Sequence, residues 1–429
     1  AEEIPDPLKD HIKGLTLDAE SIVMLRERNG ESENWTAGHI RRNGPEPDLD
    51  TLYEIGSITK VFTGVLLADL VLRKAIALDD PIGPHFPDGL LPADSPVKAI
   101  TFEQLSTHTS GLPRIPEDLF EGADADSPYA HIDTARLYRS LAALTEAEVS
   151  SPAPYEYSNL GVGLLGHLIG LIHEKPYAEV VDEVIFSPLG MADSFVQDTA
   201  TSREAAGPDQ LATPHVGGEP KSHWPLAELS GAGAIVSSAN DLARFARAHW
   251  DSETSPELAA ALSLAREKRT DTMALGWHRE QNGAVSHGGA TGGFRAHLRV
   301  DPKREFFVIR LINNGGPATE LEITGDLSPL DGYWYGYLGG IEGLFVYIKI
   351  ESKPDSPQVT LHSPDQTPHA MPVGAIEFTD ESNLSFEVPS VGGSFTGVLG
   401  RDQKLTGFWN QGLSQPLVLE WSEEVPERE

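Results

Sequence analysis

Two long segments of the chain carry apolar residues at helical spacing. Behind Ser57, the apolar positions that share one helix face are Val61, Val65, Leu66, Leu70 and Val71. The second segment, residues 160–172, is helical by length and periodicity, but it contains glycines that would weaken an exposed helix. We therefore expect this second helix to be buried and to pack closely on its neighbours.

Strand patterns lie on both sides of the helical region. Residues 21–25 and 35–40 predict a hairpin across Asn29-Gly30, and residues 284–300 and 305–313 predict further strands. Between these two groups, helices are predicted at residues 134–144, 242–250 and 256–268. This order favours an α+β fold with one antiparallel sheet built from both ends of the region.

From residue 331 the pattern changes to short alternating strands separated by turns, without a helix signal. About eight such strands in roughly 100 residues are typical of a small closed or nearly closed β-barrel. The predicted strands are residues 333–338, 344–350, 358–362, 374–378, 384–388, 394–399, 405–409 and 416–421. We place a domain boundary near residue 325, which gives a first domain of residues 1–325 and a second of residues 326–429.

The composition narrows the classes of partner. The 429 residues carry a net charge of −33, from 65 acidic and 32 basic residues, which argues against nucleic acid and anionic membrane surfaces as partners. We interpret the surplus as a sign of a salty or marine source, where counterions screen the repulsion. An acidic secreted protein is the alternative.

The chain lacks several features that would indicate a cofactor or a membrane span. It has no cysteine, which excludes disulfides, thiol catalysis and cysteine-ligated zinc. Its 15 histidines form no His-Glu-x-x-His pattern, so we expect neither a metal nor another cofactor. The longest apolar run is too short to insert in a bilayer. The chain begins at Ala1, so a removed signal peptide, and a secreted or periplasmic location, are expected; an artificial start is the alternative.

Ser57 and Lys60 form a Ser-x-x-Lys pattern where the first predicted helix begins, with Ser57 at the N-cap position. Residues three apart share a helix face, so the lysine amine can lie beside the serine hydroxyl. A desolvated lysine can then act as the base that activates the serine. A second match, Ser95-Pro96-Val97-Lys98, lies in a proline-rich loop, and we interpret it as a turn.

Tyr157-Ser158-Asn159 is the only Tyr-x-Asn pattern in the chain, and it precedes the second predicted helix. A tyrosine can transfer protons when a neighbouring lysine lowers its pKa. The asparagine amide can donate to a substrate carbonyl and accept from a lysine. A tyrosine that only packs on the surface is the alternative. His108, among Thr and Ser residues, is interpreted as a hydrogen-bonded structural residue.

His287-Gly288-Gly289 lies at the end of a predicted strand. Glycines there would let a substrate backbone approach the strand edge. The N–H groups of Ala290 and Ser57 could then form an oxyanion hole. Loss of one such donor typically costs about 10²–10³ in rate.

In combination, Ser57, Lys60, Tyr157-x-Asn159 and His287-x-Gly289 occur in the order and rough spacing of one family. The chain resembles the serine β-lactamase and penicillin-binding-protein superfamily over about residues 10 to 315. The relatives it resembles most are class C β-lactamases, D-alanyl-D-alanine carboxypeptidases, D-aminopeptidases and related esterases. The resemblance implies a β-lactamase-like catalytic domain, in which an antiparallel sheet is flanked by helices and accompanied by an all-helical region.

The resemblance also implies a role for each matching residue. Ser57 would be the acylated nucleophile. Lys60 and Tyr157 would activate it, protonate the leaving group and later activate water. Asn159 would orient Lys60 and the substrate amide, and the N–H groups of Ser57 and Ala290 would hold the oxyanion.

The third motif departs from the β-lactamase pattern, which usually has Lys-Thr-Gly where this chain has His287-Gly288-Gly289. The His-x-Gly version resembles D-peptidases, and without the lysine charge and threonine hydroxyl a substrate carboxylate is recognised less well. We therefore expect a peptidase for small peptides with D-amino acids, of the D-aminopeptidase or DD-carboxypeptidase type. The alternatives are a class C-like β-lactamase, a carboxylesterase, and a penicillin-recognising protein that is acylated without turnover.

Gly332-Tyr333-Trp334 opens the strand-rich region and resembles the lipocalin-like barrel appended to some D-amino-acid-specific peptidases of the superfamily. In such relatives the extra domain can shape the substrate cleft or mediate oligomerisation; a passive stabilising module is the alternative. The expected partner is a small peptide, amide or ester substrate, with a homo-oligomer left open.

Overall fold

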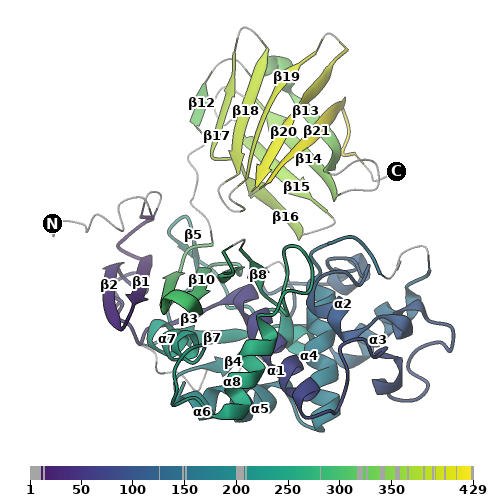
Figure 1. The fold of residues 1–429 in the computed structure, drawn as a ribbon. Helices are drawn as coiled ribbons and strands as arrows, with labels where there is room; N and C mark the ends of the chain where they lie inside the picture. The colour runs from purple at the N-terminus through teal and green to yellow at the C-terminus, as the bar shows by residue number, and fades with distance from the viewer. Residues whose placement is uncertain are drawn as a thin grey trace. The chain divides into compact units, whose positions relative to one another are not determined.

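The computed structural model divides into two compact units, Ala1–Gly315 and Gly316–Glu429, each with a hydrophobic core of its own (Figure 1). It describes residues 11–12, 15–124, 126–146, 149, 152–199, 207, 210–280, 282–315, 322–324, 327–338, 344–352, 358–364, 367–379, 382–388, 391, 393–400, 402–411 and 413–426. The division precedes the boundary expected near residue 325, because β12 (Glu322–Thr324) pairs with β17 (Ala375–Phe378) of the second unit.

The first unit contains a six-stranded antiparallel sheet with the strand order β2-β1-β11-β10-β9-β8. The strands are β1 (Ser21–Arg28), β2 (Glu31–Gly38), β8 (His278–Arg279), β9 (Val285–Ala290), β10 (Arg295–Asp301) and β11 (Phe306–Ile312). Ile22 of β1 lies opposite Ile312 of β11, so both ends of the unit contribute strands to one antiparallel sheet, as predicted. Asn29 and Gly30 both have a positive φ and make the predicted hairpin turn.

Eight α-helices are described in the first unit. They are α1 (Thr59–Leu72), α2 (Phe102–Ser106), α3 (Thr134–Ala143), α4 (Asn159–His173), α5 (Tyr177–Val181), α6 (Ser187–Leu189), α7 (Ala239–Arg247) and α8 (Pro256–Ala265). Every residue of α1 from Thr59 to Leu70 is buried, and α1 contacts α8, α4 and α5. No helix among the described residues is both long and apolar enough to cross a membrane.

The glycines of α4 permit a close approach to the 3₁₀ segment η8 (Ala227–Ala232), as expected for a buried helix. A Cβ added at Gly166 would lie 2.7 Å from the Cα of Gly231, and one added at Gly163 would lie 2.6 Å from Leu229. Because any larger side chain would force the two segments apart, these glycines bring η8 against the helix that carries Asn159 at its first position.

A short second sheet delivers Ser57 to α1. It has the order β3-β7-β4, formed by β3 (Leu52–Glu54), β7 (Ile235–Ser238) and β4 (Phe195–Val196). β3 is fully buried and ends three residues before Ser57. Its antiparallel register with β7 therefore sets the direction in which the chain enters the first helix.

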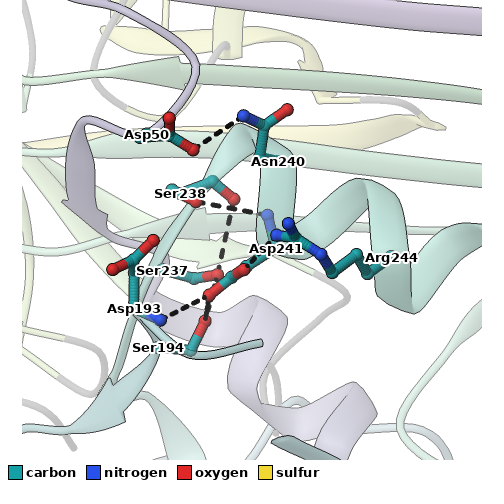
Figure 2. Close-up of polar contacts among 8 residues, drawn as sticks. All are labelled: Asp50, Asp193, Ser194, Ser237, Ser238, Asn240, Asp241 and Arg244. Carbon is teal, nitrogen blue, oxygen red and sulfur yellow. Dashed lines mark hydrogen bonds and ion pairs between the residues drawn. The ribbon is translucent and has the colours of Figure 1, made fainter. Parts of the chain in front are cut away.

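A buried polar cluster holds the end of β7 where α7 begins (Figure 2). Ser238 caps α7 by accepting from the N–H of Asp241. The Asp241 carboxylate is fully buried, and it accepts from the hydroxyl of Ser194 at 2.8 Å and from Arg244 at 2.7 Å. A carboxylate can be buried at tolerable cost when its oxygens are hydrogen-bonded in this way. The cluster ties β7 to the segment that leads into β4.

The second unit is a ten-stranded sheet that curls without closing. Its order is β12-β17-β18-β19-β20-β21-β13-β14-β15-β16. The strands not yet given are β13 (Gly332–Leu338), β14 (Leu344–Glu351), β15 (Gln358–Ser363), β16 (Thr367–Pro372), β18 (Asn383–Val388), β19 (Gly393–Leu399), β20 (Lys404–Gln411) and β21 (Leu413–Ser422). All eight predicted strands occur, and the sequence pattern missed β12 and β16. Among the described residues the two edge strands, β12 and β16, do not pair with each other, so the predicted barrel stays open between them.

Candidate active site

Ser57 lies in a 3₁₀ turn, η2 (Gly56–Ile58), between β3 and α1, and it is partly exposed. The N-cap position predicted for it is occupied by Ile58, because the 3₁₀ turn comes before the helix. Gly56 has a φ of +50°, and a Cβ there would lie 2.7 Å from the backbone nitrogen of Ala290. Glycine is therefore required at this position, both for its backbone conformation and for the contact with β9.

Lys60 is placed beside Ser57 as the Ser-x-x-Lys spacing predicts. Its Nζ lies 3.0 Å from Ser57 Oγ and donates to the carbonyl oxygen of Ala232 at 2.6 Å. The side chain is fully buried. Burial, and next the positive charge of Arg114, hold the pKa of Lys60 well below its ordinary value. A neutral amine at this position can accept the proton of the serine.

Tyr157 completes the group around the hydroxyl. Its side chain hydrogen-bonds Ser57, and its ring lies 4.9 Å from Lys60 Nζ and 5.0 Å from the guanidinium carbon of Arg114. Contrary to the expectation of a lowered pKa, burial raises the pKa of Tyr157, and the opposing effect of Arg114 is smaller. The phenol is therefore held protonated and is suited to donate a proton. The sequence did not predict a role for Arg114 because it belongs to no motif.

Asn159 is the first residue of α4, and Ser158 caps that helix by accepting from the N–H of Gly161 at 2.8 Å. The Asn159 side chain hydrogen-bonds the hydroxyl of Tyr129. Within the described residues, the hydrogen bonds of Lys60 go to Ser57 and Ala232. That Asn159 orients Lys60 therefore stays a prediction.

Gly289 and Ala290 bring the end of β9 against η2. A Cβ at Gly289 would lie 1.9 Å from the carbonyl oxygen of Ile55 and 3.1 Å from the backbone nitrogen of Ser57. Ser57 and Ala290 line one pocket, together with Asn159. The two backbone nitrogens of the predicted oxyanion hole thus belong to segments in direct contact.

His287 lies near the tyrosine of the site, and its contact with substrate stays a prediction. Its ring is buried, its Nδ1 lies 2.6 Å from the carbonyl oxygen of Gly288, and it does not line the pocket that contains Ser57. Its ring neighbours are His278, at 4.9 Å, and Tyr157, at 6.4 Å. Burial holds the pKa of His287 well below its ordinary value, so the ring is neutral. Alternate residues of a strand point to the same side of its sheet, so His287 shares a face of β9 with Gly289, which contacts η2, and its ring lies near that of Tyr157.

His108 has the structural role expected of it, although it lies beside the site. Its Nδ1 accepts from the N–H of Ser158 at 3.1 Å, and its ring centroid lies 4.4 Å from that of Tyr157. The second Ser-x-x-Lys match lies in a 3₁₀ turn, where Lys98 donates to the carbonyl oxygen of Leu91. The described residues contain no group of three or more His, Asp or Glu side chains that could hold a metal.

A pocket lies beside Ser57. The residues that line it are Gly56, Ser57, Tyr129, Asn159, Trp224, Leu226, Leu229, Ala232, Gly233, Ala290 and Thr291. Tyr129 and Trp224 were not predicted as site residues. The signal for them is weak: each is an aromatic residue in a long loop, and loops of this kind commonly shape binding sites.

Comparison with known proteins places the first unit in a family. A family model described as Beta-lactamase matches residues 24–328. Penicillin-binding protein 4 of Amycolatopsis lactamdurans is 27% identical over 334 residues, covering 70% of this chain and 84% of that protein. The D-alanyl-D-alanine-carboxypeptidase/endopeptidase AmpH of Escherichia coli K12 is 27% identical over 334 residues, covering 71% of this chain and 82% of that protein.

A solved structure shows the same fold. The class C β-lactamase from Rhodobacter sphaeroides is similar with a TM-score of 0.59 and 23% identity, covering 72% of this chain and 92% of that one. The arrangement of Ser57, Lys60 and Tyr157 lies within the matched region. Because the family model spans more than half of the chain, this protein belongs to the Beta-lactamase family and is a serine hydrolase.

Proposed function

We propose that the chain hydrolyses small peptides that contain D-amino acids, through an acyl-enzyme on Ser57. The observation that carries the proposal is the distance of 3.0 Å between Lys60 Nζ and Ser57 Oγ, with the amine fully buried. A relative named as a D-alanyl-D-alanine-carboxypeptidase/endopeptidase and another named as a penicillin-binding protein support a peptide substrate.

In the acylation step, neutral Lys60 takes the proton of Ser57 while the serine oxygen attacks the substrate carbonyl carbon. The carbonyl oxygen becomes an oxyanion that accepts hydrogen bonds from the N–H groups of Ser57 and Ala290. Tyr157 donates its proton to the leaving amine nitrogen as the C–N bond breaks, and it recovers a proton from Lys60. The products are the acyl-enzyme and a free amine.

In the deacylation step, the roles of the tyrosine and lysine run in reverse. A water molecule loses a proton to the neutral base pair and attacks the ester carbonyl of the acyl-enzyme. The same two N–H groups hold the second oxyanion. The proton then passes to Ser57 Oγ as the ester bond breaks, which releases the acid and restores the serine. No metal ion or cofactor takes part in these steps.

The D-peptide assignment depends on the third motif. His287 stands where β-lactamases of the superfamily carry a lysine, and its ring is buried and neutral. No fixed positive charge is therefore supplied from this position to a β-lactam carboxylate. A small peptide, amide or ester is the substrate partner that we propose, and secretion or a periplasmic location remains part of the proposal.

A mass and turnover experiment tests the proposal. The full chain is incubated with a chromogenic cephalosporin, a p-nitrophenyl ester and D-amino-acid p-nitroanilides, and its intact mass is followed. Turnover of the anilides is the expected result. Turnover of the cephalosporin would indicate a β-lactamase, turnover of the ester alone a carboxylesterase, and a lasting adduct without turnover a penicillin-recognising protein.

The chain supplies its own matched control for the nucleophile. Ser57→Ala should abolish both turnover and the mass adduct. Ser95→Ala, which removes the serine of the second Ser-x-x-Lys match, should leave both intact. Full activity in Ser57→Ala would refute the mechanism.

A further inference from the structure

A buried carboxylate links the strand before Ser57 to a loop far along the chain. Glu54 ends β3 and is 3% exposed. It accepts from Gln197 Nε2 at 3.1 Å, from the ring of His223 at 2.8 Å and from the backbone N–H of Trp224 at 3.0 Å. All three contacts use one oxygen, Oε1. Three donors on a single buried carboxylate oxygen hold the 223–224 segment firmly to β3.

The side chain of Trp224 is held independently of this carboxylate. A Cβ added at Gly292 would lie 2.4 Å from the indole Nε1 and 2.6 Å from Cε2, so the indole rests directly on the glycine backbone. The indole centroid also lies 5.5 Å from that of the Tyr129 ring, with an angle of 57° between the planes. The Tyr129 hydroxyl in turn hydrogen-bonds Asn159.

These contacts place an aromatic wall along the pocket that contains Ser57. Tyr129, Trp224, Leu226 and Leu229 line it, and none of the described lining residues carries a charge. An ionised group would lose its hydration here without a partner, whereas an apolar group would gain from burial.

The side of the scissile bond that the pocket serves follows from the position of Tyr157. The leaving group must reach the Tyr157 phenol to receive its proton, and Tyr157 does not line this pocket. Asn159 lines it, as do Ser57 and Ala290, the two residues whose N–H groups form the proposed oxyanion hole. The pocket therefore accommodates the part of the substrate that stays attached to Ser57, which is the acyl group.

We propose that Trp224, positioned by Glu54 and seated on Gly292, forms the wall of an acyl pocket that selects substrates with an uncharged aromatic or branched apolar group on the acyl side. The inference rests on the proposed acyl transfer at Ser57. For a peptide substrate, it specifies a D-residue with an apolar side chain before the scissile bond. Glu54 is a positioning residue, since it touches the loop and not the substrate.

The test compares p-nitrophenyl esters whose acyl groups differ in size and charge. Acetyl, phenylacetyl and hemisuccinyl esters share one leaving group, so differences in kcat/KM report on the acyl pocket. The wild-type chain should prefer phenylacetyl over acetyl by about tenfold or more, as burial of several CH₂-sized groups predicts. The hemisuccinyl ester should be the poorest of the three.

Three variants separate the wall from its supports. Trp224→Ala should lower the phenylacetyl-to-acetyl ratio about tenfold. Gly292→Ala should lower it as well, because the added Cβ displaces the indole while Glu54 is intact. Glu54→Ala should lower the ratio, and Glu54→Gln should restore part of it. Trp35→Ala is the control, since this indole lies on β2 at the opposite edge of the sheet from β8, and it should leave the ratio unchanged.

A ratio that stays within about twofold in both Trp224→Ala and Gly292→Ala, or a preference for the hemisuccinyl ester, would overturn the acyl-pocket assignment and leave the proposed function standing. Ester turnover that persists in Ser57→Ala would instead overturn the proposed function, and the acyl-pocket assignment with it. Absence of both turnover and acyl adduct in the wild-type chain would have the same consequence.

Discussion

At Ser57, a buried amine and a partly buried phenol share one hydroxyl. Removal from water disfavours the charged form of each group, so it lowers the pKa of Lys60 and raises the pKa of Tyr157. Both side chains are therefore neutral, the amine as a proton acceptor and the phenol as a proton donor. In many enzymes the environment shifts the pKa values of two neighbouring groups in opposite directions, so that one serves as the acid and the other as the base.

The first prediction concerns the base. Lys60→Arg should lower kcat/KM on a p-nitrophenyl ester by about 10²–10⁴, because a guanidinium stays protonated and cannot accept the serine proton. Lys98→Arg, in the second Ser-x-x-Lys match, is the control and should retain wild-type activity. An active Lys60→Arg variant would rule out Lys60 as the base.

The second prediction concerns pH. Activity requires neutral Lys60, so kcat/KM should fall as the pH drops through the lowered pKa of Lys60. The positive charge of Arg114 contributes to that lowering. Arg114→Gln should therefore raise the pKa and move the acid limb of the pH profile to higher pH, whereas Arg114→Lys keeps the charge and should move it less. An acid limb that does not move in Arg114→Gln would contradict this account.

At the scale of elements, the site is a contact between the 3₁₀ turn η2 and the end of β9. Neither element carries the chemistry alone. The turn presents Ser57, and the strand edge presents the N–H of Ala290. The distance between them is set by glycines at Gly56 and Gly289, where a Cβ would meet backbone atoms of the other element.

The third prediction tests this contact with two neighbouring glycines. Gly289→Ala places a Cβ 1.9 Å from the carbonyl oxygen of Ile55, so β9 must move from η2. We expect kcat to fall about 10²–10³, as for loss of an oxyanion donor, and the free energy of unfolding to fall by about 1–3 kcal/mol. At Gly288 the nearest atom to an added Cβ is 4.0 Å away, so Gly288→Ala should change neither kcat nor stability measurably. Equal effects of the two replacements would contradict the contact.

At the scale of the whole molecule, the net charge of −33 lowers the free energy of unfolding, because the carboxylates repel one another in the folded chain. Repulsion among the carboxylates acts over the Debye length, which shortens from about 10 Å at 0.1 M salt to about 3 Å at 1 M. The fourth prediction is a rise in Tm of about 5 °C or more from low to molar NaCl, measured by thermal unfolding. Sucrose at matched osmolality controls for general solute exclusion. If Tm does not rise with NaCl, the halophilic interpretation is wrong.

A second whole-molecule property is stability in mild acid. His249 is buried beside Phe245 and Trp277, both of its ring nitrogens lack a partner among the described residues, and burial holds its pKa well below 6.5. In the unfolded chain His249 binds a proton as the pH falls below about 6.5, whereas in the folded chain it stays neutral at that pH. Stability is therefore complete above pH 6.5 and falls as the pH drops below it.

The fifth prediction follows from this imbalance. His249→Phe should reduce the loss of unfolding free energy between pH 7 and pH 5, by at most about 1.4 kcal/mol for each pH unit. Chemical denaturation at several pH values measures the slope. An unchanged slope in His249→Phe would mean that His249 is not a source of the acid sensitivity.

The amino-acid sequence by itself determined the features that depend on neighbouring residues. The spacing of apolar residues predicted α1, α4 and the strands of both units, since periodicity and turn chemistry act within a few residues. The three-residue interval predicted the contact between Lys60 and Ser57. Composition by itself determined the net charge.

Only the tertiary structure decided the features that depend on segments far apart in the chain. Glu54 and Trp224 are 170 residues apart, and no local pattern predicts their hydrogen bond. The direction of the Tyr157 pKa shift depends on burial, and the side to which His287 points depends on its register in β9. Packing sets both the pKa shift and the side-chain direction. The motifs therefore identified the reacting groups, while the fold determined their protonation and their surroundings.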